Sequence, residues 1–251
     1  MRRALAALVL AAAAASIPGA AAGRGIGLSA SPLRLTLRGA STAAVVLRNP
    51  GRRALLVDVS RGGFARSPRG KPRVRPARGT AGWLRMRPRR IRIAPGAKRV
   101  LHVRAVPRRH TAPGDHPALV LLTTRPLGVK HVRVRLRVGV IAVLRVRGRI
   151  VRRLDARALM VRRSKALRLL ELHLVNRGNV TERLARDGLR LSLLSGGRKV
   201  VTLRPRSREL LPHSAGIAVF PYRGGLRGDV LARVELRPPV RGPRRSFRVR
   251  L

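Results

Sequence analysis

Short runs of alternating apolar and polar residues follow one another along most of the chain. Clear examples are PLRLTL (32–37), RVLHVRAVP (99–107) and HVRVRLRV (131–138). Alternation with a period of two residues is typical of a strand that buries one face. Glycine, proline and asparagine separate the runs at intervals of roughly 8–14 residues, as turns do between the strands of a β-sandwich. Because helical periodicity is weak throughout, the pattern predicts an all-β protein.

Two segments of the first half recur in the second half, in the same order. VVLRNPG (45–51) is matched by LHLVNRG (172–178), and GDHPALVLL (114–122) is matched by GDVLARVEL (228–236). In the first pair a strand runs into Asn-x-Gly, which favours a turn because asparagine bonds its own backbone and glycine accepts positive φ. The repeat predicts two tandem domains of one fold, each of the usual size for an immunoglobulin-like sandwich. We expect these domains at residues 23–142 and 143–251.

The stretch HVRVRLRVGVIAVLRVRG (131–148) keeps one phase of alternation throughout. Its even-numbered positions from 132 to 146 are all apolar, whereas its odd-numbered positions are basic, then apolar at Ile141 and Val143, then basic again. We expect the last strand of the first domain to run through Gly139, a possible bend, into the first strand of the second domain. Ile141 and Val143 then mark where the domains meet or where the strand changes sheets.

The first 22 residues have the build of a secretory signal peptide. A basic start at Arg2 and Arg3 precedes an apolar run that is shorter than the ~20 residues of a membrane span, and small residues end the segment. We expect cleavage after Ala22 and export of the mature chain; an uncleaved N-terminal anchor is the alternative. Since no other run of 18 apolar residues occurs, we expect no transmembrane span after signal cleavage.

Basic residues outnumber acidic residues by 58 to 9, a formal net charge of +49. The use of arginine in place of lysine suggests a GC-rich genome, which would not account for the scarcity of acids. Neighbouring arginines on one strand face lie about 6.7 Å apart and repel by roughly 0.6 kcal/mol in water, which an anionic partner would relieve. Two interpretations stay open: a polyanion-binding surface and a merely solvated basic surface. The candidate polyanion-binding residues are Arg133, Arg135, Arg137, Arg145 and Arg147.

The chemistry of the remaining residues does not predict catalysis. The nine acids form no pair at a spacing that suits glycoside hydrolysis, and no G-x-S-x-G elbow occurs. Cysteine is absent and the six histidines show no metal-ligand spacing, so we expect neither a metal site nor a cofactor. Nucleic acid is a disfavoured partner, because aromatic residues for base stacking are scarce and no helix is predicted for the major groove.

Several of these motifs resemble those of exported envelope modules of bacteria. SPLRLTL, VVLRNPG, RIRIAPGAKRV and APGDHPALVLL resemble PapD-like (pilus-chaperone-like) domains and the cell-surface WxL-interacting family, over residues 28–147. LHLVNRGNV, ELLPHSAG and LRGDVLARVEL extend the resemblance more weakly over residues 148–251. The aromatic residue that the family carries after Gly-Asp is replaced by His116 and Val230. In pilus chaperones a basic pair in the interdomain cleft anchors a subunit's terminal carboxylate, but the sequence assigns no arginine to that pair.

These observations predict a non-catalytic, exported binding or scaffold protein, extracellular or associated with the cell envelope. It would recognise partners by strand edges or by charge. The alternatives are a periplasmic-type chaperone for surface-polymer subunits and a secreted binder of polyanions such as teichoic-type polymers, acidic polysaccharides or nucleic acid. The expected partner is therefore an envelope protein or an anionic cell-surface polymer.

Overall fold

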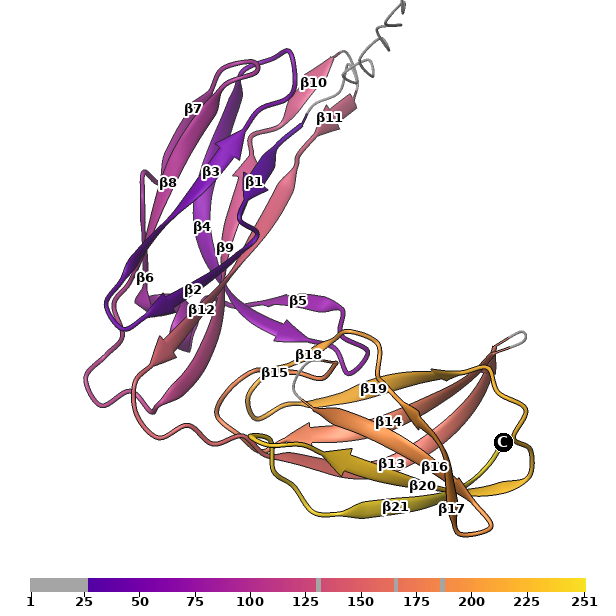
Figure 1. The fold of residues 1–251 in the computed structure, drawn as a ribbon. Helices are drawn as coiled ribbons and strands as arrows, with labels where there is room; N and C mark the ends of the chain where they lie inside the picture. Colours follow the sequence, from indigo (N-terminus) through magenta and orange to yellow (C-terminus); the bar gives the residue numbers. More distant parts are fainter. Residues whose placement is uncertain (1–26, 130–131, 165–166, 186–187) are drawn as a thin grey trace, which may run out of the picture.

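The computed structural model describes residues 27–129, 132–164, 167–185 and 188–251. Its strands form two β-sandwiches, which are the two lobes of Figure 1. The described residues contain one short 3₁₀ helix, η1 (Gly79–Trp83), and no other helix. The all-β prediction is therefore confirmed, whereas the predicted signal peptide (1–22) lies outside the described residues.

The first sandwich packs a four-stranded sheet against a six-stranded sheet. The smaller sheet has the order β1 (Ser29–Ser31), β3 (Thr42–Arg48), β8 (Lys98–Ala105) and β6 (Leu84–Arg87). The larger sheet has the order β2 (Arg34–Arg38), β12 (Arg137–Val146), β9 (Gly114–Thr124), β4 (Leu55–Arg66) and β5 (Pro72–Arg75), with β7 (Arg90–Ile93) also paired to β4. A small hairpin of β10 (Leu127–Val129) and β11 (Val132–Val134) separates β9 from β12 in the chain.

The second sandwich repeats this strand order in a reduced form. One sheet has the order β13 (Leu154–Ser164), β14 (Leu167–Asn176) and β19 (Ala215–Tyr222). The other has the order β17 (Arg198–Leu203), β16 (Leu189–Ser195), β20 (Asp229–Leu236) and β21 (Arg245–Arg250), and β15 (Glu182–Arg183) pairs with β18 (Glu209–Leu210) beside them. The series β21-β20-β16-β17 corresponds to β12-β9-β4-β5, so the predicted recurrence of one topology is visible in the strand order.

The two Asn-x-Gly turns have the same hydrogen bonds in both sandwiches. The carboxamide oxygen of Asn49 accepts a hydrogen bond from the N–H of Gly51, and its nitrogen donates to the carbonyls of Ile93 and Ala94. Asn176 bonds in the same way to Gly178 and to the carbonyls of Leu210 and Leu211. Both asparagines are fully buried, so each ties the end of one strand to a distant loop of its own sandwich.

The predicted crossing of residues 131–148 into the second domain is wrong. β12 pairs with β9 without a break from Arg137 to Val146, because Gly139 continues the ladder and does not bend the strand. Its even-numbered residues Val140, Ala142 and Leu144 are buried in the first core, as the alternation predicts. The strand thus passes the expected boundary at residues 142 and 143, and the second sandwich begins with β13.

The apolar patch of this strand does lie where the two domains meet. Ile141 packs against a small cluster formed by Phe64, Leu119 and Leu121 of the first sandwich and Leu211 of the second. Outward-facing apolar residues of the larger sheet are therefore covered by the second domain.

Candidate functional site

The first part of β12 has an unpaired edge. β2 pairs with β12 only from Ile141 to Arg145, and among the described residues no strand pairs with that side of residues 137–140. The N–H of Ile141 donates to the carbonyl of Leu33, at 2.9 Å. Because alternate residues of a strand direct their backbone groups to the same side, those of Arg137 and Gly139 face this open edge.

Apolar side chains accompany the open edge. Val134 is 36% exposed, and Leu136 and Val138 are partly buried. Leu136 and Val138 share the phase of alternation with Val140, which is fully buried in the core, and Val134 ends the adjacent hairpin strand β11. An incoming strand would find both free backbone groups and alternating apolar side chains here, which are the two elements of recognition by strand addition.

The five predicted polyanion-binding arginines do not form one group. Arg133, Arg135 and Arg137 are exposed at the open edge and the hairpin beside it. Arg145 and Arg147 lie at the other end of β12, and the eight steps from Arg137 to Arg145 span roughly 26 Å of strand. Whether either group binds a polyanion stays a prediction.

Arg145 lies in a cleft of about 540 Å³ between the domains, where its guanidinium forms an ion pair with Asp115. Its Nε and one Nη donate to the two carboxylate oxygens of Asp115, at 2.6 and 2.8 Å. The N–H of Thr181, from the second domain, donates to the same carboxylate at 2.9 Å. Burial opposes the ionisation of Asp115, but these hydrogen bonds outweigh it and hold its pKa below the ordinary value of 3.8. In return, the hydrogen bond to Asp115 raises the pKa of Arg145.

Most of the other arginines of the cleft also have carboxylate partners. Arg34 donates to Glu209 at 2.6 Å, and Arg152 forms a two-point ion pair with Glu182 at 3.0 and 2.6 Å. Arg38 is exposed in the cleft and has no carboxylate partner among the described residues. The Nε of Arg34 is buried and has no hydrogen-bond partner in this part of the chain. Strand β2 therefore brings two groups into the cleft that suit an anionic ligand. They are the guanidinium of Arg38 and the unsatisfied Nε–H of Arg34.

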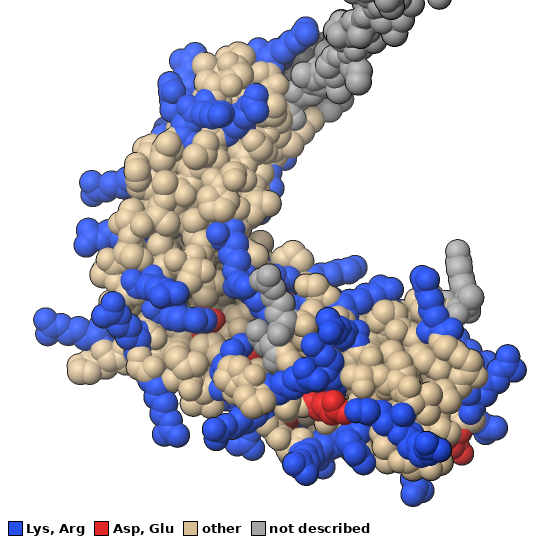
Figure 2. All heavy atoms as spheres, in the orientation of Figure 1, with Lys and Arg blue, Asp and Glu red and all other residues tan. Residues whose placement is uncertain are grey.

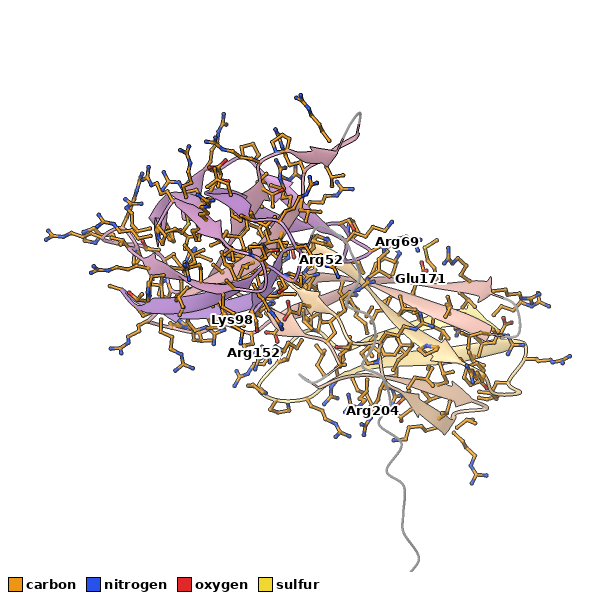
Figure 3. The ribbon with its side chains drawn as sticks, turned by 90° about the horizontal axis from the view of Figure 1, so that it is seen from above. Arg52, Arg69, Lys98, Arg152, Glu171 and Arg204 are labelled. Atoms are coloured by element: carbon orange, nitrogen blue, oxygen red, sulfur yellow. The ribbon has the colours of Figure 1, made fainter. Side chains whose placement is uncertain are left out.

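A second set of contacts fixes the turn between β4 and β5 onto the second domain. Arg69 pairs with Glu171 at 3.3 and 3.4 Å, and the two side chains lie together between the lobes (Figure 3). The carbonyl of Pro68 accepts from the N–H of Ile217 at 3.0 Å. Arg208 donates to the carbonyls of Pro68 and Arg69, and burial together with nearby arginines lowers its pKa. The domains are thus joined by these contacts as well as by those of the cleft.

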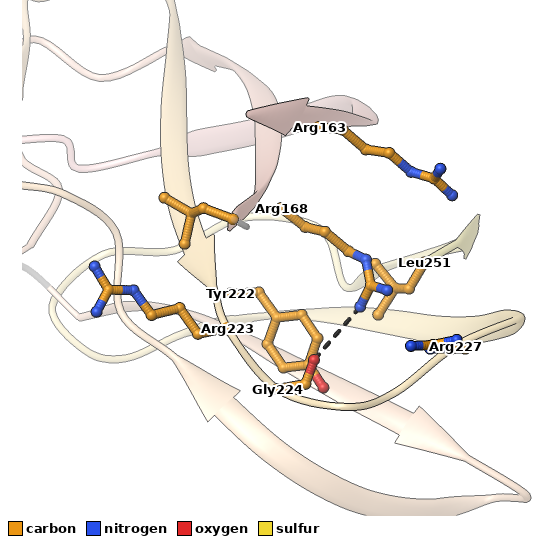
Figure 4. Close-up of a pocket in the computed structure, with 8 residues that line it drawn as sticks. Arg163, Arg168, Tyr222, Arg223, Gly224, Arg227 and Leu251 are labelled. Carbon is orange, nitrogen blue, oxygen red and sulfur yellow. Dashed lines mark hydrogen bonds between the residues drawn. The ribbon is translucent and has the colours of Figure 1, made fainter. Parts of the chain in front are cut away.

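A smaller cavity of about 400 Å³ lies at one end of the second sandwich (Figure 4). Arg168 donates to the carbonyls of Gly224 and Leu226, and the hydroxyl of Tyr222 accepts from the N–H of Leu226 at 3.0 Å. These contacts hold the loop after β19. Arg168 and Tyr222 therefore have a structural role, which makes this cavity a weaker candidate than the cleft.

Of the charged cleft residues, the sequence singled out Arg145 alone, as a candidate polyanion-binding residue, and it did not reveal the partners that these residues have. Arg34 and Glu209 meet across 175 positions, and Asp115 and Thr181 meet across 66. The repeated Gly-Asp at 114–115 and 228–229 marked Asp115 as part of a repeat, but a repeat does not predict an ion pair. Arginine is so frequent in this chain that no single arginine was distinctive.

Comparison with known proteins identifies the class of fold. The crystal structure of the class 5 fimbriae chaperone CfaA matches 89% of this chain and 98% of its own, with a TM-score of 0.53 and 10% sequence identity. A chaperone–tip adhesin complex of CFA/I fimbriae matches 88% of this chain and 98% of its own, with a TM-score of 0.51 and 10% identity. No family model and no curated protein sequence matches the chain. The fold is therefore the PapD-like fold of fimbrial chaperones, with two β-sandwich domains.

The described residues contain no helix that is long and apolar enough to span a membrane.

Proposed function

We propose that this chain is an exported, non-catalytic protein of chaperone type that holds a protein subunit of the cell surface by strand addition. The observation that carries the proposal is the open edge of β12, where the backbone groups of Arg137 and Gly139 face outward beside Val134, Leu136 and Val138. An exposed edge of this kind pairs readily with a further strand. The fold likeness to fimbrial chaperones supports this function over a general scaffold.

The cleft supplies the second half of the proposed site. The resemblance to pilus chaperones implies a basic pair that anchors the terminal carboxylate of a bound subunit. Arg38 is the cleft arginine without a carboxylate partner among the described residues, and the unsatisfied Nε of Arg34 comes from the same strand. We assign the anchoring role to the guanidinium of Arg38 and to the unsatisfied Nε–H of Arg34, although another nitrogen of Arg34 pairs with Glu209. Arg145 and Arg152 are less suitable, because each already uses its Nε and one Nη in a two-point ion pair.

Capture of partners from the organism's own cell-envelope extract tests the proposed function. The full chain is immobilised, and bound material is washed in about 1 M salt, where the Debye length is about 3 Å and charge attraction is screened. We expect a specific protein to stay bound to the unmodified chain. Val134→Arg should lower its capture by roughly tenfold or more, because an arginine would be buried without a partner against the incoming strand.

Val200→Arg is the matched control for this experiment. Val200 is a 54% exposed valine on β17, an edge strand of the second sandwich. Its replacement adds the same charge to an edge strand and should leave capture unchanged. Equal loss in both variants, or elution of all bound protein at modest salt, would contradict strand addition at β12.

A further inference from the structure

The outer face of the smaller sheet of the first domain differs from the outer faces of the other three large sheets that the structure describes. Twelve side chains of β1, β3, β8 and β6 point outward from this sheet, and all of them are exposed. None of these twelve side chains is acidic, and those that are not basic are serine, threonine, alanine or valine. The cationic members of this face are Arg48, Arg85, Arg87, Lys98 and Arg104, and His102 lies among them.

The other three large sheets all carry carboxylates on their outer faces. The larger sheet of the first domain carries Asp58 and Asp115. In the second domain, the sheet of β13, β14 and β19 carries Asp155 and Glu171, and the sheet of β17, β16, β20 and β21 carries Asp229 and Glu235. In a molecule with so few acids, their distribution leaves a single broad sheet face with positive charge alone. Basic side chains are abundant in the chain, and they cover both lobes on the side that Figure 2 shows. It is therefore the absence of acids that distinguishes this face.

The register places the cations at the two ends of the face and valines between them. Arg85 pairs with Arg104 and Arg87 with His102 at one end, and Arg48 pairs with Lys98 at the other. Between these rows Val46 pairs with Val100, and their exposed fractions are 39% and 45%. Like charges directly opposite each other in a sheet are destabilising, and an anionic partner relieves that repulsion.

We propose that this face docks onto the surface of an anionic lipid bilayer. The face is a broad sheet surface and not a groove, and a membrane can contact both cationic ends at once. Phosphates of the headgroups pair with the arginine forks, while the apolar boundary below the headgroups receives Val46 and Val100. A soluble polyanion would satisfy the arginines but would leave the valines in water, so the pattern favours lipid.

The proposed membrane face and the proposed strand-binding edge are compatible. β12 belongs to the opposite sheet of the same sandwich, so the two outer faces of the domain point in opposite directions. A chain that is bound to a membrane through the smaller sheet would still present β12 to a subunit. The lipid proposal does not depend on the proposed function, and each can fail alone.

Vesicle co-sedimentation of the full chain tests the proposal. Phosphatidylcholine vesicles with and without phosphatidylglycerol serve as the probe, and the test variant is Arg85→Gln/Arg87→Gln/Arg104→Gln. We expect the unmodified chain to bind only the anionic vesicles. Each basic residue near such a surface contributes about fivefold in affinity, so the triple variant should bind on the order of 100-fold more weakly.

The matched control is Arg233→Gln/Arg248→Gln/Arg250→Gln. It removes the same three charges from an outer sheet face of the second domain, which carries Asp229 and Glu235. It should keep most of the vesicle binding. Equal losses in the two triple variants would show attraction by net charge alone and would overturn the proposal. Circular dichroism of both variants confirms that each is folded.

Val46→Ser/Val100→Ser distinguishes lipid from a soluble polyanion. This variant keeps every charge, and it should lose severalfold in vesicle affinity because two apolar contacts with the interface are gone. Binding of soluble polyphosphate should be weaker than binding of vesicles and unaffected by the valine substitutions. Polyphosphate that binds this face as tightly as vesicles do, or vesicle binding that is indifferent to the valines, would overturn the choice of lipid.

Discussion

The carboxylate of Asp115 connects three parts of the molecule. It lies on β9, accepts both hydrogen bonds of Arg145 on the neighbouring strand, and accepts the N–H of Thr181 from the second domain. Its side chain is only 1% exposed. A buried carboxylate with three donors is expected to fix the geometry of the cleft, because the removal of its charge leaves Arg145 without a partner.

Asp115→Asn should lower the stability of the protein at neutral pH by about 1–3 kcal/mol. The folded-state pKa of Asp115 lies below its ordinary value of 3.8, so its contribution is fully present above that value and is lost as the pH falls through the folded-state pKa. Urea denaturation from pH 7 to pH 3 measures this. The difference between the variant and the unmodified chain should be largest near neutrality and should shrink on acidification; a constant difference would contradict the account.

At the scale of single residues, sequence reasoning identified local chemistry and missed distant partners. The Asn-x-Gly turns at Asn49 and Asn176 could be predicted, because both bond to a glycine two residues away. Their bonds to loops 34–45 residues distant could not be predicted from local chemistry. The same limit applies to Asp115, whose repeat partner Asp229 is exposed and forms no comparable contact among the described residues.

At the scale of elements, the close approach of the β9 entry to the second domain depends on Gly114. This residue has φ 125°, and a Cβ added to it would lie 2.2 Å from the carbonyl oxygen of Asn179. The same carbonyl accepts the N–H of Asp115 at 2.7 Å, and the side chain of Asn179 donates to the carbonyl of Pro113 at 3.0 Å. The domains can meet here only because the first residue of β9 has no side chain.

Gly114→Ala should therefore loosen the contact between the domains. The link between the sandwiches (147–153) contains Arg147, Arg149, Arg152 and Arg153, so limited trypsin digestion reports its exposure. We expect faster cleavage within the link in Gly114→Ala than in the unmodified chain.

Gly228→Ala is the internal control for this prediction. Gly228 is the repeat equivalent of Gly114, has φ 79°, and has no atom within 4 Å of an added Cβ. Alanine there carries the local penalty of a positive φ, about 1–2 kcal/mol, but it touches nothing in the other domain. Similar trypsin patterns for the two variants would show that the contact at Gly114 does not hold the domains together.

The strands themselves could be predicted because their alternation directly reflects burial. Val140, Ala142 and Leu144 are buried on the predicted face of β12, and Ile141 lies in the contact with Leu211. The end of the strand could not be predicted, because alternation continues through residues 143–146 whichever domain contains them. The pairing with β9 determines that they belong to the first sandwich.

At the scale of the whole molecule, the scarce acids are concentrated where the lobes join. Asp115, Glu171, Glu182 and Glu209 are four of the nine acidic residues, and each pairs with an arginine at or beside the junction. Asp115, Glu171 and Glu209 each accept a hydrogen bond from a residue of the opposite domain. These ion pairs oppose the mutual repulsion of two strongly basic lobes, and composition alone could not reveal that placement.

The open edge of β12 is where the proposed function places the partner protein. β2 covers the half of the strand nearest the cleft, and residues 137–140 are left without a second neighbour among the described strands. The cleft residues Arg38 and Arg34 lie on β2, beside the covered half. A partner strand would therefore pair with one half of β12, and its terminal carboxylate would lie towards the cleft.

Amide hydrogen exchange, resolved by residue in the free chain and in its complex with the captured subunit, tests this account most directly. In the free chain the amides of Arg137 and Gly139 should exchange quickly, whereas those of Val138 and Val140, which face β9, should be protected. Binding of the subunit should then protect Arg137 and Gly139 selectively. Protection of these two amides before binding, or protection confined to another edge such as β17 on binding, would contradict strand addition at β12.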